Sequence, residues 1–132
     1  MTIGRVYETV LYGRPVHELA RFYRETLALR QVAEFASAVA FRLPDGGVLL
    51  LFDPELQERP ERTIPSHGAR GPGHAAFSVG RGELERWAGA LRDHGIELEH
   101  AQAWDEAGGR SIYFRDPVGN SIELIEGEAW PP

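Results

Sequence analysis

Residues 115–125 read RDPVGNSIELI, a turn with proline and glycine followed by an apolar strand that a single glutamate, Glu123, interrupts. Residues 42–52 read RLPDGGVLLLF and keep the same order of arginine, proline- and glycine-containing turn, and apolar strand. Proline and glycine supply the backbone angles of tight turns, so each segment predicts the second half of a β-hairpin. Two copies of one motif indicate an internal repeat.

Each predicted hairpin follows a strand, a helix and a further short strand. The helices are predicted from apolar residues at helical spacing in residues 16–27 and 84–94. The strands are predicted at residues 6–12, 31–34, 39–42 and 48–52 in the first half, and at residues 74–79, 96–100, 111–114 and 121–125 in the second. The order is therefore β-α-β-β-β, twice. Chance similarity of two hairpins in a mixed fold is the alternative, but the matching order of elements favours a repeat.

The repeat predicts an α+β protein built from two βαβββ modules. One such module cannot cover both faces of its sheet, so two modules are expected to pair into a cupped mixed sheet with the helices outside. The 132 residues suit one domain. We expect module one at residues 4–56, a linker rich in Pro, Arg, Glu and Gly at residues 57–71, and module two at residues 72–128.

Composition excludes several classes of function. The chain has no cysteine, and all 14 of its basic residues are arginine, so thiolate chemistry, a lysine Schiff base and a Walker-type phosphate loop are excluded. A net charge of −6 argues against nucleic acid as a partner. No apolar run is long enough to cross a membrane, and the first residues contain no signal sequence, so we expect a cytoplasmic protein with no membrane partner.

Three polar residues do not fit their strands. Alternation puts Glu123 on the face opposite Ile122 and Leu124, between apolar neighbours, where an unpaired carboxylate is costly. His74 shares its strand face with small residues, and Glu8 holds the corresponding place in module one. Each residue alone has an ordinary explanation: a solvent-facing residue, or for Glu123 an ion pair with an arginine such as Arg115.

Together, one imidazole and two carboxylates predict a metal site. Glu8, His74 and Glu123 would form a facial triad with open positions, which suits Mn or Fe best and leaves Zn or Ni as alternatives. The open positions would bind adjacent oxygens of a small-molecule substrate. Tyr113 and Ser111 alternate onto the same strand face, so Tyr113 is the candidate catalytic residue, with simple packing as its alternative. Ser111 and Tyr12 are the candidate substrate-binding residues.

Residues 8–29, 73–77 and 113–124 resemble the vicinal oxygen chelate superfamily, which holds glyoxalase I, extradiol dioxygenases, fosfomycin-resistance thiol transferases, methylmalonyl-CoA epimerase and bleomycin-resistance proteins. The resemblance covers nearly the whole chain. It implies paired βαβββ modules, often completed in a homodimer, with His74 and Glu123 at ligand positions. Glu8 stands where the family usually has histidine. Leu50 stands where glyoxalase I and the epimerase carry a fourth ligand, which argues against isomerase and epimerase chemistry.

Two classes of function remain open. The first is a metal-dependent enzyme for a small substrate with vicinal oxygens: a dioxygenase, a lyase or a thiol transferase. The second is a metal-free binder of the bleomycin-resistance type, in which acidic charge and the residues Trp87, Trp104 and Trp130 would hold a cationic aromatic ligand. For Trp87, packing in the core is the favoured alternative. The metal-ligand triad separates the two, because metal-free relatives usually lose those residues.

Overall fold

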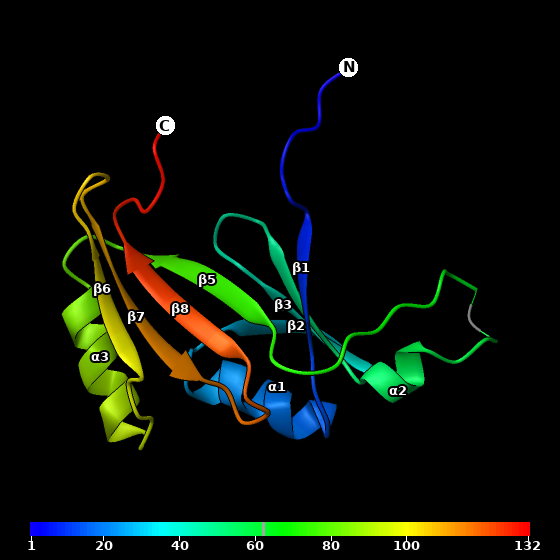
Figure 1. Ribbon diagram of the computed structural model, residues 1–132. Coiled ribbons are helices and arrows are strands. Elements are labelled where there is room, and N and C mark those ends of the chain that lie inside the picture. Colours follow the sequence, from blue (N-terminus) through cyan, green and yellow to red (C-terminus); the bar gives the residue numbers. More distant parts are fainter. Residues whose placement is uncertain (62) are drawn as a thin grey trace. The chain divides into compact units, whose positions relative to one another are not determined.

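The computed structural model describes residues 1–61 and 63–132. The chain divides into two compact units, residues 1–71 and 72–132, each with its own four-stranded sheet (Figure 1). The linker predicted at residues 57–71 contains Arg62, which lies outside the described residues. Among the described helices, none has the length and apolar character needed to span a bilayer.

Unit 1 contains one βαβββ module and an additional short helix. Its elements are β1 (Glu8–Tyr12), α1 (Val16–Glu25), β2 (Arg30–Phe35), β3 (Ala38–Arg42), β4 (Val48–Phe52) and α2 (Pro54–Gln57). The sheet order is β1-β4-β3-β2, with β1 parallel to β4 and the other pairs antiparallel. The apolar side of α1 covers β3 and β4, and Leu19 and Tyr23 are completely buried there.

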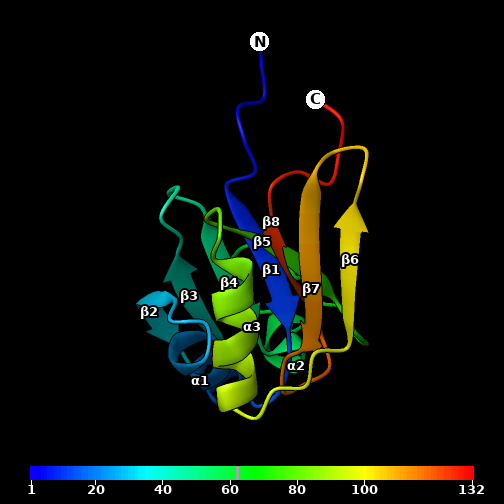
Figure 2. The same cartoon turned by 90° about the vertical axis from the view of Figure 1, so that its left-hand side faces the viewer.

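Unit 2 repeats this topology. Its elements are β5 (His74–Val79), α3 (Leu84–Asp93), β6 (His100–Trp104), β7 (Gly109–Arg115) and β8 (Ser121–Glu126). The sheet order is β5-β8-β7-β6, again with one parallel pair, β5 and β8. The helix α3 contacts β7 and β8 and lies along the strands (Figure 2). The predicted α+β fold of two βαβββ modules is therefore confirmed.

The two hairpin turns repeat in atomic detail. The guanidinium of Arg42 donates to the carbonyl of Gly46 at 3.0 Å, and that of Arg115 donates to Gly119 at 3.1 Å. Both glycines have positive φ angles, 85° and 93°, which a residue without Cβ adopts at little cost. The arginine and the glycine common to the two sequence motifs therefore serve one turn geometry used twice.

Two elements differ from the prediction. The strand predicted at residues 96–100 forms at His100–Trp104 instead, because residues 94–96 still close the end of α3: Gly95 donates to Arg92 and Ile96 to Leu91. The short helix α2 was not predicted. Asp53 begins it by accepting hydrogen bonds from the N–H groups of Glu55 and Leu56, a standard helix start.

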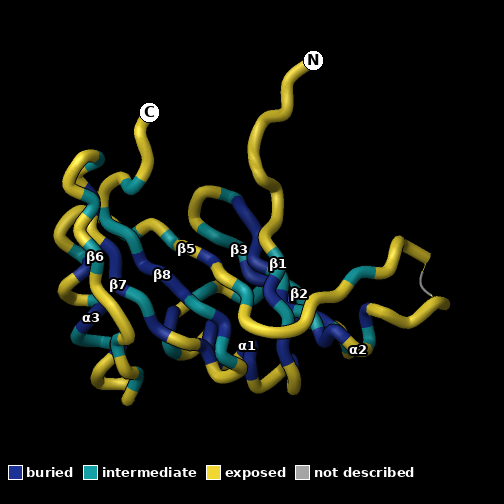
Figure 3. Tube along the Cα trace, viewed as in Figure 1, coloured by how far each residue is buried: buried dark blue, intermediate teal, exposed yellow. Residues whose placement is uncertain are grey.

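In each sheet, the strand residues that face the helix form the apolar core. Phe41, Leu49 and Leu51 are completely buried in unit 1, and Phe114 and Ile122 are completely buried in unit 2 (Figure 3). The N-terminus of α3 is hydrogen-bonded to the end of β8, since the Glu126 carboxylate accepts from the N–H of Leu84 at 3.1 Å. In unit 2, the opposite sheet face carries the polar residues Ser111 and Glu123.

The end of α1 generates a stability prediction. Ala28 has a φ of 54°, whereas Gly95 holds the corresponding left-handed position after α3 with a φ of 75°. A Cβ in this region costs about 1 kcal/mol relative to glycine. We expect Ala28→Gly to raise the free energy of unfolding, measured in urea, by up to about 1 kcal/mol, and Gly95→Ala to lower it by a similar amount. A destabilised Ala28→Gly protein would contradict this assignment.

Candidate metal centre

Four strands bring polar side chains to the sheet face of unit 2 that points away from α3. Glu123 in β8 lies between Ala76 in β5 and Tyr113 in β7, its register partners. Ser111 precedes Tyr113 by two residues, so it shares this face. Ile122 and Leu124, on the other face, are buried in the core as predicted.

A buried turn sets the alignment of β5 with β8. The side-chain oxygen of Asn120 accepts from the N–H of Gly73 at 2.7 Å, and its amide donates to Asp116 at 2.8 Å. Asp116 in turn accepts from the N–H of Asn120 at 2.9 Å. Asn120 and Asp116 are almost completely buried. This clamp joins the residue before His74 to the residue before Ser121, and so fixes His74 beside the start of β8.

His74 presents one nitrogen to the backbone and the other to Glu123. Its Nδ1 lies 3.0 Å from the carbonyl oxygen of Ser121. A carbonyl only accepts, so Nδ1 carries a proton. The other nitrogen, Nε2, lies 3.4 Å from Oε2 of Glu123. In the neutral imidazole Nε2 has a lone pair, so two electron-rich atoms converge, an arrangement that a metal ion or a proton stabilises.

Glu123 is a buried carboxylate. Its side chain is 9% exposed, whereas that of His74 is 53% exposed. The hydroxyl of Ser111 donates to Oε1 of Glu123 at 2.5 Å, which offsets part of the cost of burying the charge. The two ordinary explanations for Glu123 are wrong: it does not face open solvent, and Arg115 forms its ion pair with Glu99, at 2.7 Å.

Tyr113 lies between two histidine rings on the same face. Its ring stacks on His74 at a centroid distance of 6.4 Å, and the ring of His100 is 6.0 Å away on β6. Burial raises the pKa of Tyr113 above its usual value, and a hydrogen bond to Glu123 raises it further. The phenol is therefore a hydrogen-bond donor beside the carboxylate.

Sequence reasoning named Trp104 only as a candidate ligand-binding residue and missed its place beside Ser111. Its indole Nε1 donates to the hydroxyl of Ser111 at 2.8 Å, which places it next to the Glu123 carboxylate. The predicted position of β6 was four residues too early, which left Trp104 in a loop. With β6 at its observed position, strand alternation puts His100, Gln102 and Trp104 on the face of Ser111 and Tyr113.

A sequence profile of the Glyoxalase/Bleomycin resistance protein/Dioxygenase superfamily matches residues 5–124. The chain belongs to this superfamily.

Individual members of the superfamily give closer comparisons. The crystal structure of lactoylglutathione lyase from Agrobacterium tumefaciens superimposes with a TM-score of 0.91 at 35% identity, and the match covers 98% of both chains. Metallothiol transferase FosB from Staphylococcus saprophyticus is 30% identical over 107 residues, which cover 80% of this chain and 66% of that protein. FosB from Bacillus licheniformis is 27% identical over 109 residues, again 66% of that protein. The chain thus spans slightly less than two thirds of these curated relatives.

Unit 1 carries an apolar counterpart of this polar sheet face. Leu50 pairs with Val10 and Ala40, the same register positions that Ala76 and Tyr113 hold around Glu123. Leu50 therefore occupies the place of Glu123 in the repeat, and its side chain has no atom that could bind a metal ion. Glu8 is exposed at the start of β1.

Tyr12 contacts the segment that follows module one. Its hydroxyl lies 2.6 Å from Nδ1 of His67, and the His67 ring packs on Phe52 with centroids 4.7 Å apart. His67 is half-buried by these contacts. Burial also raises the pKa of Tyr12 above its usual value. Its predicted substrate-binding role remains a prediction.

The structure brings two of the three predicted ligands together. Within the described residues, no group of three or more His, Asp or Glu side chains forms a cluster suited to a metal ion. His74 and Glu123 form a close pair in unit 2. Glu8 belongs to unit 1, and the two units are not placed relative to one another, so its part in the site remains a prediction.

The Asn120 clamp generates a prediction. Asn120→Ala removes the acceptor of the Gly73 N–H and a donor to Asp116. Losing partners of buried polar groups costs about 1–3 kcal/mol, so we expect a loss of about 2 kcal/mol in urea unfolding. Asp45→Ala, which removes an acceptor from the N–H of Gly47 at the surface turn of unit 1, is the control and should cost about 0.5 kcal/mol. Equal losses in the two variants would refute a special role for the clamp.

Proposed function

We propose that this chain is a divalent-metal-dependent enzyme whose ion is held by His74, Glu123 and Glu8. The observation that carries the proposal is the approach of His74 Nε2 to Glu123 Oε2 at 3.4 Å. Both groups have outer partners typical of metal ligands: the imidazole donates to a backbone carbonyl, and the carboxylate accepts from a hydroxyl. Such partners orient metal ligands and fix the histidine tautomer.

The donor set suits a hard or borderline ion. One imidazole and two carboxylates favour Mn or Fe, with Zn or Ni as alternatives. Two carboxylates also balance the charge of a divalent ion in a partly buried place. The resemblance to the superfamily implies ligand positions at His74 and Glu123, and this chain has no cysteine that could compete for the ion.

The reaction class is thiol transfer or a related lyase reaction on a small substrate with adjacent oxygens. The relatives that support it are named metallothiol transferase and lactoylglutathione lyase; the first name refers to a thiol and the second to a thioester of the thiol glutathione. Leu50 in place of a fourth ligand favours the transferase over the lyase. A dioxygenase has weaker support, because the oxidase among the similar structures is only 24% identical and so shows the fold alone.

Each residue has a defined task in this proposal. The metal, when bound, polarises the substrate oxygens as a Lewis acid. Tyr113 donates a hydrogen bond from its hydroxyl to a substrate oxygen that gains negative charge. Ser111 holds the carboxylate of Glu123, and Tyr12 contacts the substrate. The remaining elements of the proposal are a cytoplasmic setting and a homodimer, as the resemblance to the superfamily implies.

A metal-free ligand binder is the second candidate. A pocket of about 330 Å³ beside Trp104 is lined by the carboxylate residues Asp105 and Glu106 and by alanines. An indole face with carboxylates nearby suits an organic cation. This candidate predicts a protein that binds such a cation with or without metal present.

Metal analysis separates the two candidates. We expect protein purified without chelator and supplied with Mn(II) to hold about one ion per chain. His74→Ala and Glu123→Ala should abolish stoichiometric binding, and Glu8→Ala should weaken it, because each removes an ion-binding atom. His94→Ala is the matched control, since His94 Nδ1 also lies 3.0 Å from a backbone carbonyl, that of Ala90, in α3. Glu97→Gln is the exposed carboxylate control.

The outcomes are distinct. Binding by the parent and both controls, with loss in the His74 and Glu123 variants, supports the enzyme. A parent that takes up none of Mn(II), Fe(II), Zn(II) and Ni(II) overturns the proposed function and favours the binder.

A further inference from the structure

Three side chains from neighbouring strands form a chain of hydrogen bonds. Trp104 at the end of β6 donates to Ser111 in β7 at 2.8 Å, and Ser111 donates to Oε1 of Glu123 in β8 at 2.5 Å. Ser111 is 1% exposed, so water does not compete freely for its hydroxyl. This series of hydrogen bonds ends at the Glu123 carboxylate, whose other oxygen, Oε2, faces His74.

The donor and acceptor capacities of the side chains fix the direction of these hydrogen bonds. An indole N–H can only donate, and a serine hydroxyl has one proton and two acceptor positions. Ser111 must therefore accept from Trp104, and its single proton is directed to Glu123. A serine without the indole could rotate its hydroxyl toward other acceptors, so Trp104 selects the orientation that holds Oε1.

We propose that Trp104 is a positioning residue for the metal ligand Glu123 and acts through Ser111. With Oε1 held by the hydroxyl, Oε2 is the carboxylate oxygen directed toward His74. The carboxylate is thereby pre-oriented before an ion arrives, which lowers the ordering cost of binding. The metal-binding part of this inference depends on the proposed function, whereas the orientation of the carboxylate does not.

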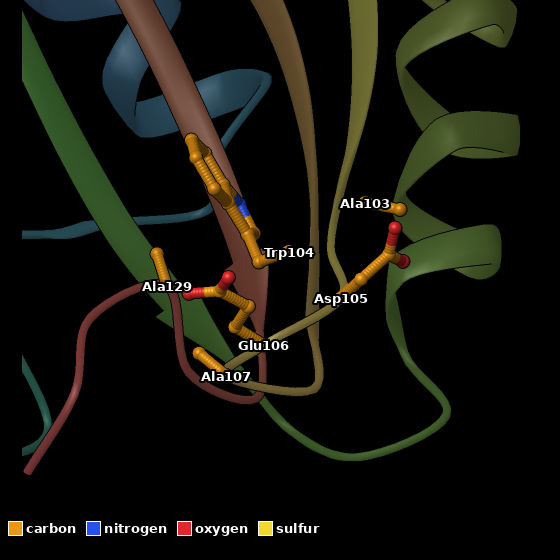
Figure 4. A pocket seen from close by; sticks show the side chains of 6 residues that line it. All are labelled: Ala103, Trp104, Asp105, Glu106, Ala107 and Ala129. Atoms are coloured by element: carbon orange, nitrogen blue, oxygen red, sulfur yellow. The ribbon is translucent and has the colours of Figure 1, made fainter.

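The indole is itself held in place. Its ring stacks on Trp130 with a centroid distance of 6.5 Å and an interplanar angle of 29°. Figure 4 shows Trp104 among the residues that line the pocket described above, together with Glu106, Ala107 and Ala129. One side chain therefore connects a surface pocket to the carboxylate of the candidate metal centre. The chain has three tryptophans, so each indole can be observed and replaced separately.

The first experiment uses the metal-free full chain and the three indole N–H signals in a ¹H–¹⁵N spectrum. Trp104→Phe identifies its signal by loss. We expect the Trp104 N–H to exchange slowly with solvent in the parent, and to shift and exchange at least about 10-fold faster in Ser111→Ala. In Glu123→Gln the signal should also shift, since the hydroxyl then meets a neutral acceptor. Trp87, in α3, is the internal reference.

The second experiment measures Mn(II) affinity by calorimetry in a double-mutant cycle. Residues that orient metal ligands typically contribute 10–100-fold in affinity. We expect Trp104→Phe and Ser111→Ala each to weaken Mn(II) binding about 10-fold. If Trp104 acts through Ser111, adding Trp104→Phe to Ser111→Ala should change the affinity less than about 2-fold further. Trp130→Phe keeps an aromatic ring beside Trp104 and leaves the Trp104–Ser111 hydrogen bond in place, so it is the matched control and should leave the affinity within about 2-fold.

The results decide the inference independently of the proposed function. If the Trp104 indole N–H signal is unchanged in both Ser111→Ala and Glu123→Gln, the inference is overturned, whether or not Mn(II) binds. Fully additive losses in the cycle also overturn it, because Trp104 would then act by another route. A parent that shows the indole response but binds no metal rejects the proposed function and retains Trp104 as the residue that orients Glu123.

Discussion

The candidate site depends on the alignment of two parallel strands, and one buried asparagine fixes that alignment. Parallel strands are not joined by a tight turn, so local chain geometry does not set which residues of β5 and β8 lie side by side. Asn120 fixes the alignment: its side chain accepts a hydrogen bond from the N–H of Gly73 and donates one to the carboxylate of Asp116. A shift of one residue would move His74 relative to Glu123 and turn every side chain of the strand to the other face.

The two copies of the repeated fold differ in the residues on one sheet face. The sheet face of unit 2 carries Glu123, Tyr113 and Ser111, and the corresponding positions of unit 1 carry Leu50, Ala40 and Ala38. The turns, the strand order and the helix packing are shared, since they depend on the arginine, glycine and apolar residues common to both halves. A few polar residues in place of apolar ones on one sheet face are enough to create a candidate site, which is how one fold supports several functions.

Local patterns were enough to predict the modules, because turn residues and apolar spacing act within a few residues. Alternation also placed Glu123 on the face opposite Ile122 correctly. The partners of Glu123 could not be predicted in the same way. Ser111 reaches it across a strand pair, and Trp104 reaches Ser111 across another, so both contacts depend on strand register. The position of the edge strand β6 is set by its hairpin with β7, and the predicted strand at residues 96–100 began too early.

The central claim is that His74 and Glu123 together bind a divalent ion. The most direct measurement is an anomalous-difference map from crystals of the protein grown with Mn(II). The account predicts one strong peak within bonding distance of His74 Nε2 and Glu123 Oε2, with Ser111 still bound to the other carboxylate oxygen. A map without a peak beside these two atoms, in crystals whose solution contains millimolar Mn(II), would contradict it.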